Sequence, residues 1–68
     1  MVREMTRFIE LAQARDDILI KYLKRCVTTL EYRNPVDRGM IQGLQLIIES
    51  YEEQAVEYTR LLDALRGE

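Results

Sequence analysis

The spacing of apolar residues constrains this chain more than any other feature of its sequence. Before Asn34-Pro35, apolar side chains recur in steps of three and four at Met5, Ile9, Ala12, Leu19, Leu23, Cys26 and Leu30. After it, the same steps run without a break through Ile41, Leu44, Ile48, Tyr51, Ala55, Tyr58, Leu62 and Leu65. These steps are typical of helices, and neither half shows the period of two of a strand. The pattern predicts an all-α fold with two long helices.

The dipeptide Asn34-Pro35 separates the two predicted helices. Asn34 can cap a helix with its side-chain oxygen, and Pro35 loses no hydrogen bond at the first helical position. We therefore predict a helix at about residues 3–31, a turn at about 32–34 and a helix at about 35–66. Because so short a turn makes the helices antiparallel, the 68 residues are expected to form a single helical-hairpin domain.

Asp16 is the one charged residue on the apolar stripe of the first helix. Pairing the helices about the predicted turn places Asp16 opposite Tyr51 and Ala12 opposite Ala55. Since a phenol can donate a hydrogen bond to a carboxylate, we predict that Asp16 and Tyr51 form a polar pair in the core. The alternative is that Asp16 contacts a ligand between subunits. Cys26 lies on the same stripe and is expected to be a small buried apolar residue.

Each helix carries more apolar residues than one stripe can bury. The surplus consists of Phe8, Leu11, Ile18, Ile20, Tyr22, Val27, Met40, Leu46, Ile47, Val56 and Leu61. Leaving about half of these side chains in water would forfeit on the order of 10 kcal/mol, which is comparable to the stability of a whole domain. We therefore expect homo-oligomerisation into a four-helix bundle or a larger ring, or docking on a larger protein.

Two glycines one turn apart, Gly39 and Gly43, stand near the start of the second helix. Each costs about 1 kcal/mol relative to alanine inside a helix. Their missing side chains would permit a close approach of the first helix near Lys24 and Thr28, or of a second chain. Together with the surplus, they predict an oligomer or partner interface formed by Phe8, Leu11, Ile18, Tyr22, Gly39, Met40, Gly43 and Ile47.

The net charge of −2 is unevenly distributed. Residues 21–43, around the turn, carry five cations against Glu31 and Asp37, hence +3, and the rest of the chain carries −5. A basic end can contact phosphate or nucleic acid. The candidate contact residues are Lys21, Lys24, Arg25 and Arg38. The alternative is a solvated face whose charges guide antiparallel assembly.

The residue types argue against an enzyme. The chain has no His, one Cys and no Gly-rich phosphate loop, which excludes a zinc site and a Ser-His-Asp triad. Glu49 and Glu52 share a helix face and could hold Mg²⁺, but the second carboxylate pair of helical nucleotide pyrophosphatases is missing. We predict no catalytic, cofactor-binding or metal-binding residue. We also expect no membrane contact, because the densest apolar stretch is far shorter than ~20 residues, and a cytoplasmic location.

One stretch resembles a known group of proteins. Leu30-Glu31-Tyr32-Arg33, followed by Gly39-Met40-Ile41-Gln42-Gly43-Leu44, resembles short helical-hairpin proteins encoded near the head genes of tailed bacteriophages, which carry a Tyr-Arg and then Gly-x-Ile-x-Gly-Leu. Here residues 34–38 separate the two motifs. The resemblance implies a phage accessory or virion-associated protein without enzymatic activity, in the host cytoplasm or the virion. In shape alone, the predicted hairpin is also similar to the plasmid copy-number hairpin protein that dimerises and binds paired RNA loops.

Two functional hypotheses follow. The first is a non-enzymatic protein–protein assembly module whose partners are further copies of itself and a larger protein. The second is a dimeric RNA- or nucleotide-binding helical bundle that uses the basic turn end. Neither hypothesis requires a cofactor.

Overall fold

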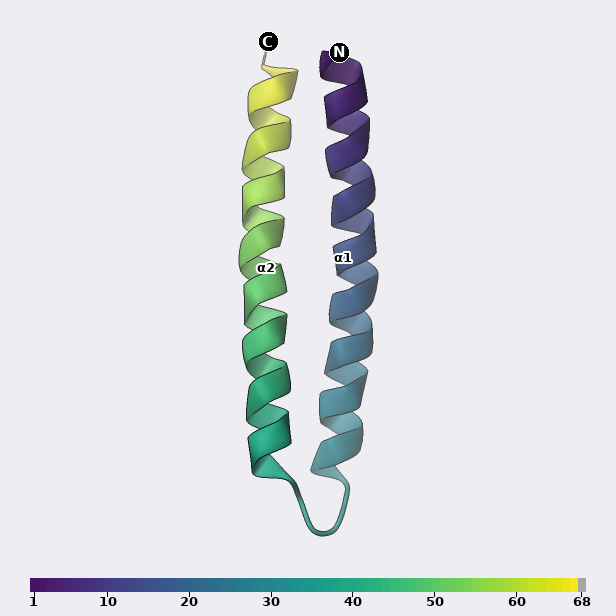
Figure 1. Ribbon diagram of the computed structural model, residues 1–68, viewed down its shortest axis with the longest axis vertical. Helices are drawn as coiled ribbons and strands as arrows, with labels where there is room; N and C mark the ends of the chain where they lie inside the picture. Colours follow the sequence, from purple (N-terminus) through teal and green to yellow (C-terminus); the bar gives the residue numbers. More distant parts are fainter. Residues whose placement is uncertain (68) are drawn as a thin grey trace.

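The computed structural model describes residues 1–67 as two helices joined by a short connection. Helix α1 spans Val2–Glu31 and helix α2 spans Arg38–Arg66. The helices run antiparallel and side by side, and the connection lies at the end opposite to both termini (Figure 1). The hairpin measures 53 Å along its axis and 14 by 12 Å across. The predicted all-α hairpin is therefore confirmed.

The connection between the helices is longer than the sequence predicted. Helix α2 does not begin at Pro35 with Asn34 as its cap, because its N-cap is Asp37. Asp37 Oδ1 accepts a hydrogen bond from the Met40 backbone amide at 3.0 Å. An aspartate satisfies the free amides of the first turn as well as an asparagine does, and its negative charge also favours the positive end of the helix dipole. The connection therefore covers residues 32–37, and the Asn34–Pro35 peptide bond within it is cis.

Replacing Asp37 with alanine is expected to lower the free energy of unfolding by about 1 kcal/mol, the usual cost of losing an N-cap. Urea denaturation measures this change. Asn34→Ala is the matched control, and it is expected to cost less because Asn34 is not the cap of α2. A larger loss for Asn34→Ala than for Asp37→Ala would contradict the observed start of α2.

The core of the hairpin is a narrow row of side chains on each helix. On α2 the buried and half-buried residues are Ile41, Leu44, Ile48, Tyr51, Ala55, Tyr58, Leu62 and Leu65, all of which the spacing predicted. On α1 the corresponding row is Thr6, Ile9, Gln13, Asp16, Ile20, Leu23, Val27 and Leu30. We call these rows the core seams. Their steps of three and four average 3.5 residues, as in a coiled coil.

The core seam of α1 differs from the predicted stripe at every second position. Met5, Leu19 and Cys26 were predicted to be buried, and all three are exposed. Val27 is buried and Ile20 is half-buried in their place, although both had been assigned to the surplus. At Leu19/Ile20 and at Cys26/Val27 both candidate positions hold apolar residues, so the sequence spacing alone is ambiguous there. Packing against α2 rotates α1 toward the second set.

The register of the two helices also differs from the predicted one. The predicted turn places Gln13 opposite Gln54, whereas Gln13 Nε2 donates a hydrogen bond to Thr59 Oγ1 at 3.3 Å. Each residue of α1 therefore lies opposite a residue of α2 that is about one helical turn nearer the C-terminus than the predicted one. The later start of α2, at Arg38, accounts for part of this shift.

Candidate functional site

A second row of residues runs along each helix, one residue before each core-seam position. On α1 this row is Met5, Phe8, Ala12, Arg15, Leu19, Tyr22, Cys26 and Thr29. On α2 it is Met40, Gly43, Ile47, Ser50, Gln54, Glu57, Leu61 and Ala64. All of these residues are exposed except Ala12, which is half-buried. We call the two rows the open seams. Because one residue turns a helix by about 100°, each open seam faces nearly at right angles to its core seam.

Ion pairs between the helices show on which side of the hairpin the open seams lie. Lys24 Nζ is 3.6 Å from Glu52 Oε2, and Arg66 Nη2 is 4.0 Å from Glu10 Oε1. Each of these four residues directly follows a core-seam residue, so the pairs lie on one side of the hairpin. The open seams precede the core seams and therefore lie together on the other side.

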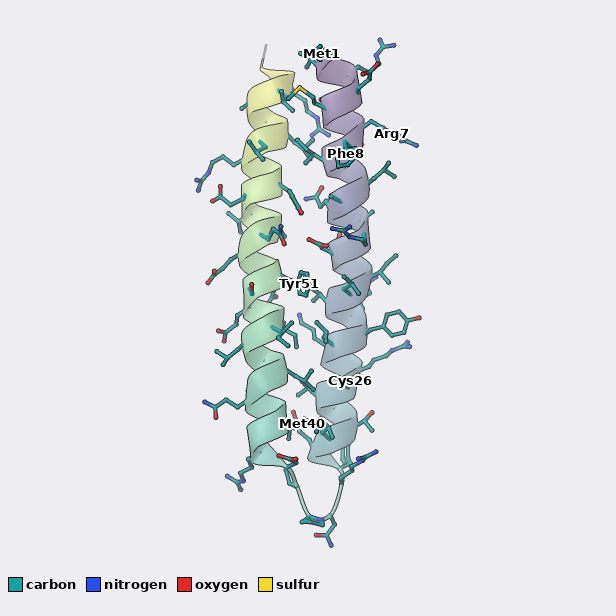
Figure 2. The ribbon with its side chains drawn as sticks, in the orientation of Figure 1. Met1, Arg7, Phe8, Cys26, Met40 and Tyr51 are labelled. Atoms are coloured by element: carbon teal, nitrogen blue, oxygen red, sulfur yellow. The ribbon has the colours of Figure 1, made fainter. Side chains whose placement is uncertain are left out.

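The two open seams form one largely apolar face across both helices, which we call the open face. Its large apolar side chains are strongly exposed, with Phe8 at 77% and Tyr22 at 61%. In Figure 2, Phe8 and Cys26 mark this face on α1 and Met40 marks it on α2. A continuous exposed apolar surface on a soluble protein typically marks an interaction site.

The structure brings most of the predicted interface residues to the open face. Those that belong to it are Phe8, Tyr22, Met40, Gly43 and Ile47. Leu11 and Ile18 are also exposed, but they follow the outer surface of α1 beyond the open seam. Gly39 lies at the start of α2, where an added Cβ would be 3.6 Å from Asp37 Oδ1.

Gly43 does not make the predicted close contact with α1. A Cβ built on Gly43 would meet no atom of α1 within 4 Å. The hairpin itself therefore gives no packing reason for a glycine inside a helix, where it costs about 1 kcal/mol relative to alanine. The alternative prediction, a close contact with a second chain, remains.

Part of this face was not expected from the spacing of apolar residues. Met5, Leu19 and Cys26 had been assigned to the core, and they lie on the open face. The signal that could have found them is a second row of apolar residues with the same steps of three and four, displaced by one residue from the first. Such a pair of rows indicates a helix with two neighbours.

Asp16 is buried between the helices, with 1% of its surface exposed. Its Oδ1 accepts a hydrogen bond from Arg15 Nε at 3.4 Å, and its Oδ2 has no partner within residues 1–67. The predicted hydrogen bond from Tyr51 is therefore not formed. The shift in register brings Ala55, which cannot donate, opposite Asp16. Tyr51 lies between the helices (Figure 2), four residues nearer the connection than Ala55.

The predicted basic site is only partly assembled. Lys21, Lys24 and Arg25 line one shallow groove on the surface of α1, together with Tyr22. Arg38 lines a different hollow, near the connection. Lys24 is also paired with Glu52, which reduces the positive charge available for a ligand.

Two of the acidic residues of α2 form ion pairs with cations of the hairpin. Glu57 Oε1 is 3.1 Å from Arg60 Nη1, and Glu52 pairs with Lys24. Within the described residues, no three His, Cys, Asp or Glu side chains are grouped so that they could hold a metal ion. Neither helix in that range is long and apolar enough to cross a membrane.

The open face and the basic groove are thus the two candidate sites of the hairpin. Comparison of the chain with protein-family models, with curated proteins and with solved structures found no match.

Proposed function

We propose that this protein is a non-enzymatic assembly module that binds other proteins, first of all a second copy of itself, through the open face. One observation carries the proposal: a row of large exposed apolar side chains from each helix lies on the open face, and the ion pairs that join the helices lie on the opposite side of the hairpin. A helix pair that worked alone in water would have no reason to separate its two sides in this way.

The thin core of the hairpin supports the same proposal. Among the described residues, the buried apolar side chains are Val27, Leu30, Ile48 and Leu62. A single core in a chain of this size rarely supplies more than about 3–5 kcal/mol of stability. Each large side chain that association removes from water adds about 1.5–3 kcal/mol when fully buried. Self-association therefore supplies stability that one hairpin lacks.

Further apolar residues lie outside the open face and remain available to a larger partner. On α1 these are Leu11 and Ile18, and on α2 they are Leu46 and Val56, all of them exposed. The resemblance of the Tyr32-Arg33 and Gly39–Leu44 stretches to proteins encoded near phage head genes suggests what that partner is. We place it among the proteins of a tailed-phage virion or of its assembly.

The variant Ile47→Glu tests the open face. The wild-type protein is expected to be dimeric or larger at micromolar concentration, and Ile47→Glu to weaken association at least about 100-fold, because the interface would have to bury an unpaired carboxylate. Sedimentation equilibrium or light scattering measures the mass. Val56→Glu is the matched control: both residues are β-branched and exposed on α2, and Val56 lies outside the open face.

Two results would contradict this proposal. One is a folded monomer of the wild-type protein up to millimolar concentration. The other is equal weakening by Ile47→Glu and Val56→Glu, which would show that the open face is not the interface. Circular dichroism at the same concentrations shows whether a variant that dissociates is still helical.

A second function, binding of RNA or a nucleotide, is favoured by the three cations that share the groove on α1. Gel-shift assays at two salt concentrations separate this function from the first. Binding to RNA that weakens steeply with salt and is lost in Lys21→Glu/Arg25→Glu, without any self-association, would place nucleic-acid binding first.

A further inference from the structure

We infer that the open face is covered by a second hairpin related by a twofold axis parallel to the helices, with both connections at the same end and with Arg15 of each copy contacting Glu57 of the other. This inference rests on the proposed self-association and specifies its geometry. The product is an antiparallel four-helix bundle in which α1 of one copy packs between the two α2 helices.

The angle between the two seams supports a bundle of four helices. On both helices the open seam is displaced from the core seam by one residue, which corresponds to a rotation of about 100°. A helix at the corner of a square bundle contacts two neighbours in directions about 90° apart. Two hairpins therefore complete the square and use both seams of every helix.

The area of the open face matches the requirement of a stable dimer. The Cα atoms of the hairpin extend 53 Å by 14 Å, a footprint of roughly 740 Å², which is of the same order as the ~800 Å² of accessible surface that each partner contributes to a standard interface. Most of the side chains that would be covered are apolar, including Phe8, Leu19, Ile47 and Leu61. A second hairpin covers the face along its whole length, whereas a short peptide would leave much of it in water.

The register of the hairpin determines which residues of the two copies meet. The hydrogen bond from Gln13 to Thr59 places these residues at one level along the axis. Because the helices are antiparallel, a step of two residues forward from Gln13 to Arg15 matches a step of two residues back from Thr59 to Glu57. Arg15 and Glu57 are therefore also level, and both belong to the open seams. A twofold axis parallel to the helices preserves levels, so each Arg15 meets the Glu57 of the other copy.

Side-chain sizes on the same levels are complementary. By the same counting from the hydrogen bond, Phe8 is level with Ala64, Tyr22 with Ser50, and Thr29 with Gly43. Each of these three larger residues on α1 thus meets a smaller residue on α2 of the other copy. Gly43, which has open space around its Cα within the hairpin, acquires a neighbour in this arrangement.

Both charged partners are accessible for this contact. The Arg15 side chain is 70% exposed while its Nε contacts Asp16, and the Glu57 side chain is 57% exposed. The opposite orientation, with the connections at opposite ends, is disfavoured. In that orientation the open seams of the two α1 helices would pack against each other, with the twofold axis crossing near the middle of α1. Because Arg15 lies within about one turn of that point, the two arginines would come close together and repel each other.

The test reverses these two charges separately and then mixes the variants. Arg15→Glu alone and Glu57→Arg alone are each expected to weaken the homodimer about tenfold, because like charges then meet twice in every dimer. An equimolar mixture is expected to return to within about threefold of the wild-type dissociation constant, because both contacts in the heterodimer are again between opposite charges. The double variant Arg15→Glu/Glu57→Arg is expected to do the same.

The control is Arg60→Glu, which removes the contact of Glu57 within its own chain but lies outside the open face. It is expected to leave the dissociation constant within about twofold of wild type. One outcome separates the two proposals: the wild type is a dimer that Ile47→Glu disrupts, but mixing the two charge-reversal variants does not restore the dissociation constant. In that case the arrangement inferred here is wrong, and the proposed use of the open face stands. If the wild type is monomeric, both are wrong.

Discussion

Replacing Leu62 with alanine is expected to lower the free energy of unfolding by about 2–5 kcal/mol. Leu62 is the least exposed of the buried apolar residues, at 4%. Because the core is a single layer between two helices, no second layer of side chains is present to fill the cavity. The loss would remove a large part of the total stability expected for a chain of this length, and it would be measured by urea or thermal denaturation at a fixed protein concentration.

Leu46→Ala is the matched control for this experiment. Leu46 belongs to the same helix, but it is exposed and lies outside both seams of α2. Alanine is at least as favourable as leucine in a helix, so this variant is expected to change the free energy of unfolding by less than about 0.5 kcal/mol. Equal losses from the two variants would contradict the packing of α2 described above.

Replacing Asp16 with leucine is expected to raise the free energy of unfolding by about 1–3 kcal/mol. Asp16 is buried, its Oδ2 has no partner within residues 1–67, and its Oδ1 has only a long contact with Arg15. A buried polar atom without a partner costs about this amount, and an apolar side chain of similar size avoids the cost. The midpoint of thermal unfolding reports the change.

Asp17→Leu is the control for Asp16→Leu, because it makes the same change one residue later at an exposed position. It is expected to change stability by less than about 0.5 kcal/mol. A loss of more than about 1 kcal/mol on Asp16→Leu would show that the carboxylate makes a favourable contact in solution beyond its contact with Arg15.

Asp16 also has a connection to the proposed interface through its neighbour. Its Oδ1 holds Arg15 Nε, and Arg15 lies on the open face. A buried polar residue in a helical bundle can specify register or oligomeric state at a cost in stability. We therefore expect the Asp16→Leu variant to be more stable than the wild type but to form a mixture of oligomeric states. Sedimentation velocity on the same samples measures the distribution of masses.

Helix α2 was the most predictable part of the molecule. All eight residues of its core seam, from Ile41 to Leu65, follow from the spacing of apolar residues alone. The reason is that its second row contains Gly43, Ser50 and Glu57, so only one row on α2 is apolar throughout. Burial of one unambiguous apolar stripe fixes the orientation of a helix whatever its partner is.

Helix α1 was predictable in extent but not in orientation. Its apolar residues occupy two rows, and the sequence contains no preference between Leu19 or Cys26 on one row and Ile20 or Val27 on the other. The true seam also includes the half-buried Gln13, which donates a hydrogen bond to Thr59 in the other helix. A contact between residues so far apart in the chain cannot be recognised from local spacing.

The sequence by itself determined that the chain forms two long helices, that they pair as a hairpin, and that more apolar surface is present than the hairpin can bury. These properties depend on periodicity and composition, which are local or additive. Only the tertiary structure decided the rotation of α1, the register against α2, the cap at Asp37 and, through them, the side of the hairpin on which the surplus gathers. Each of these depends on contacts between residues far apart in the chain, and those contacts are decided by both helices together.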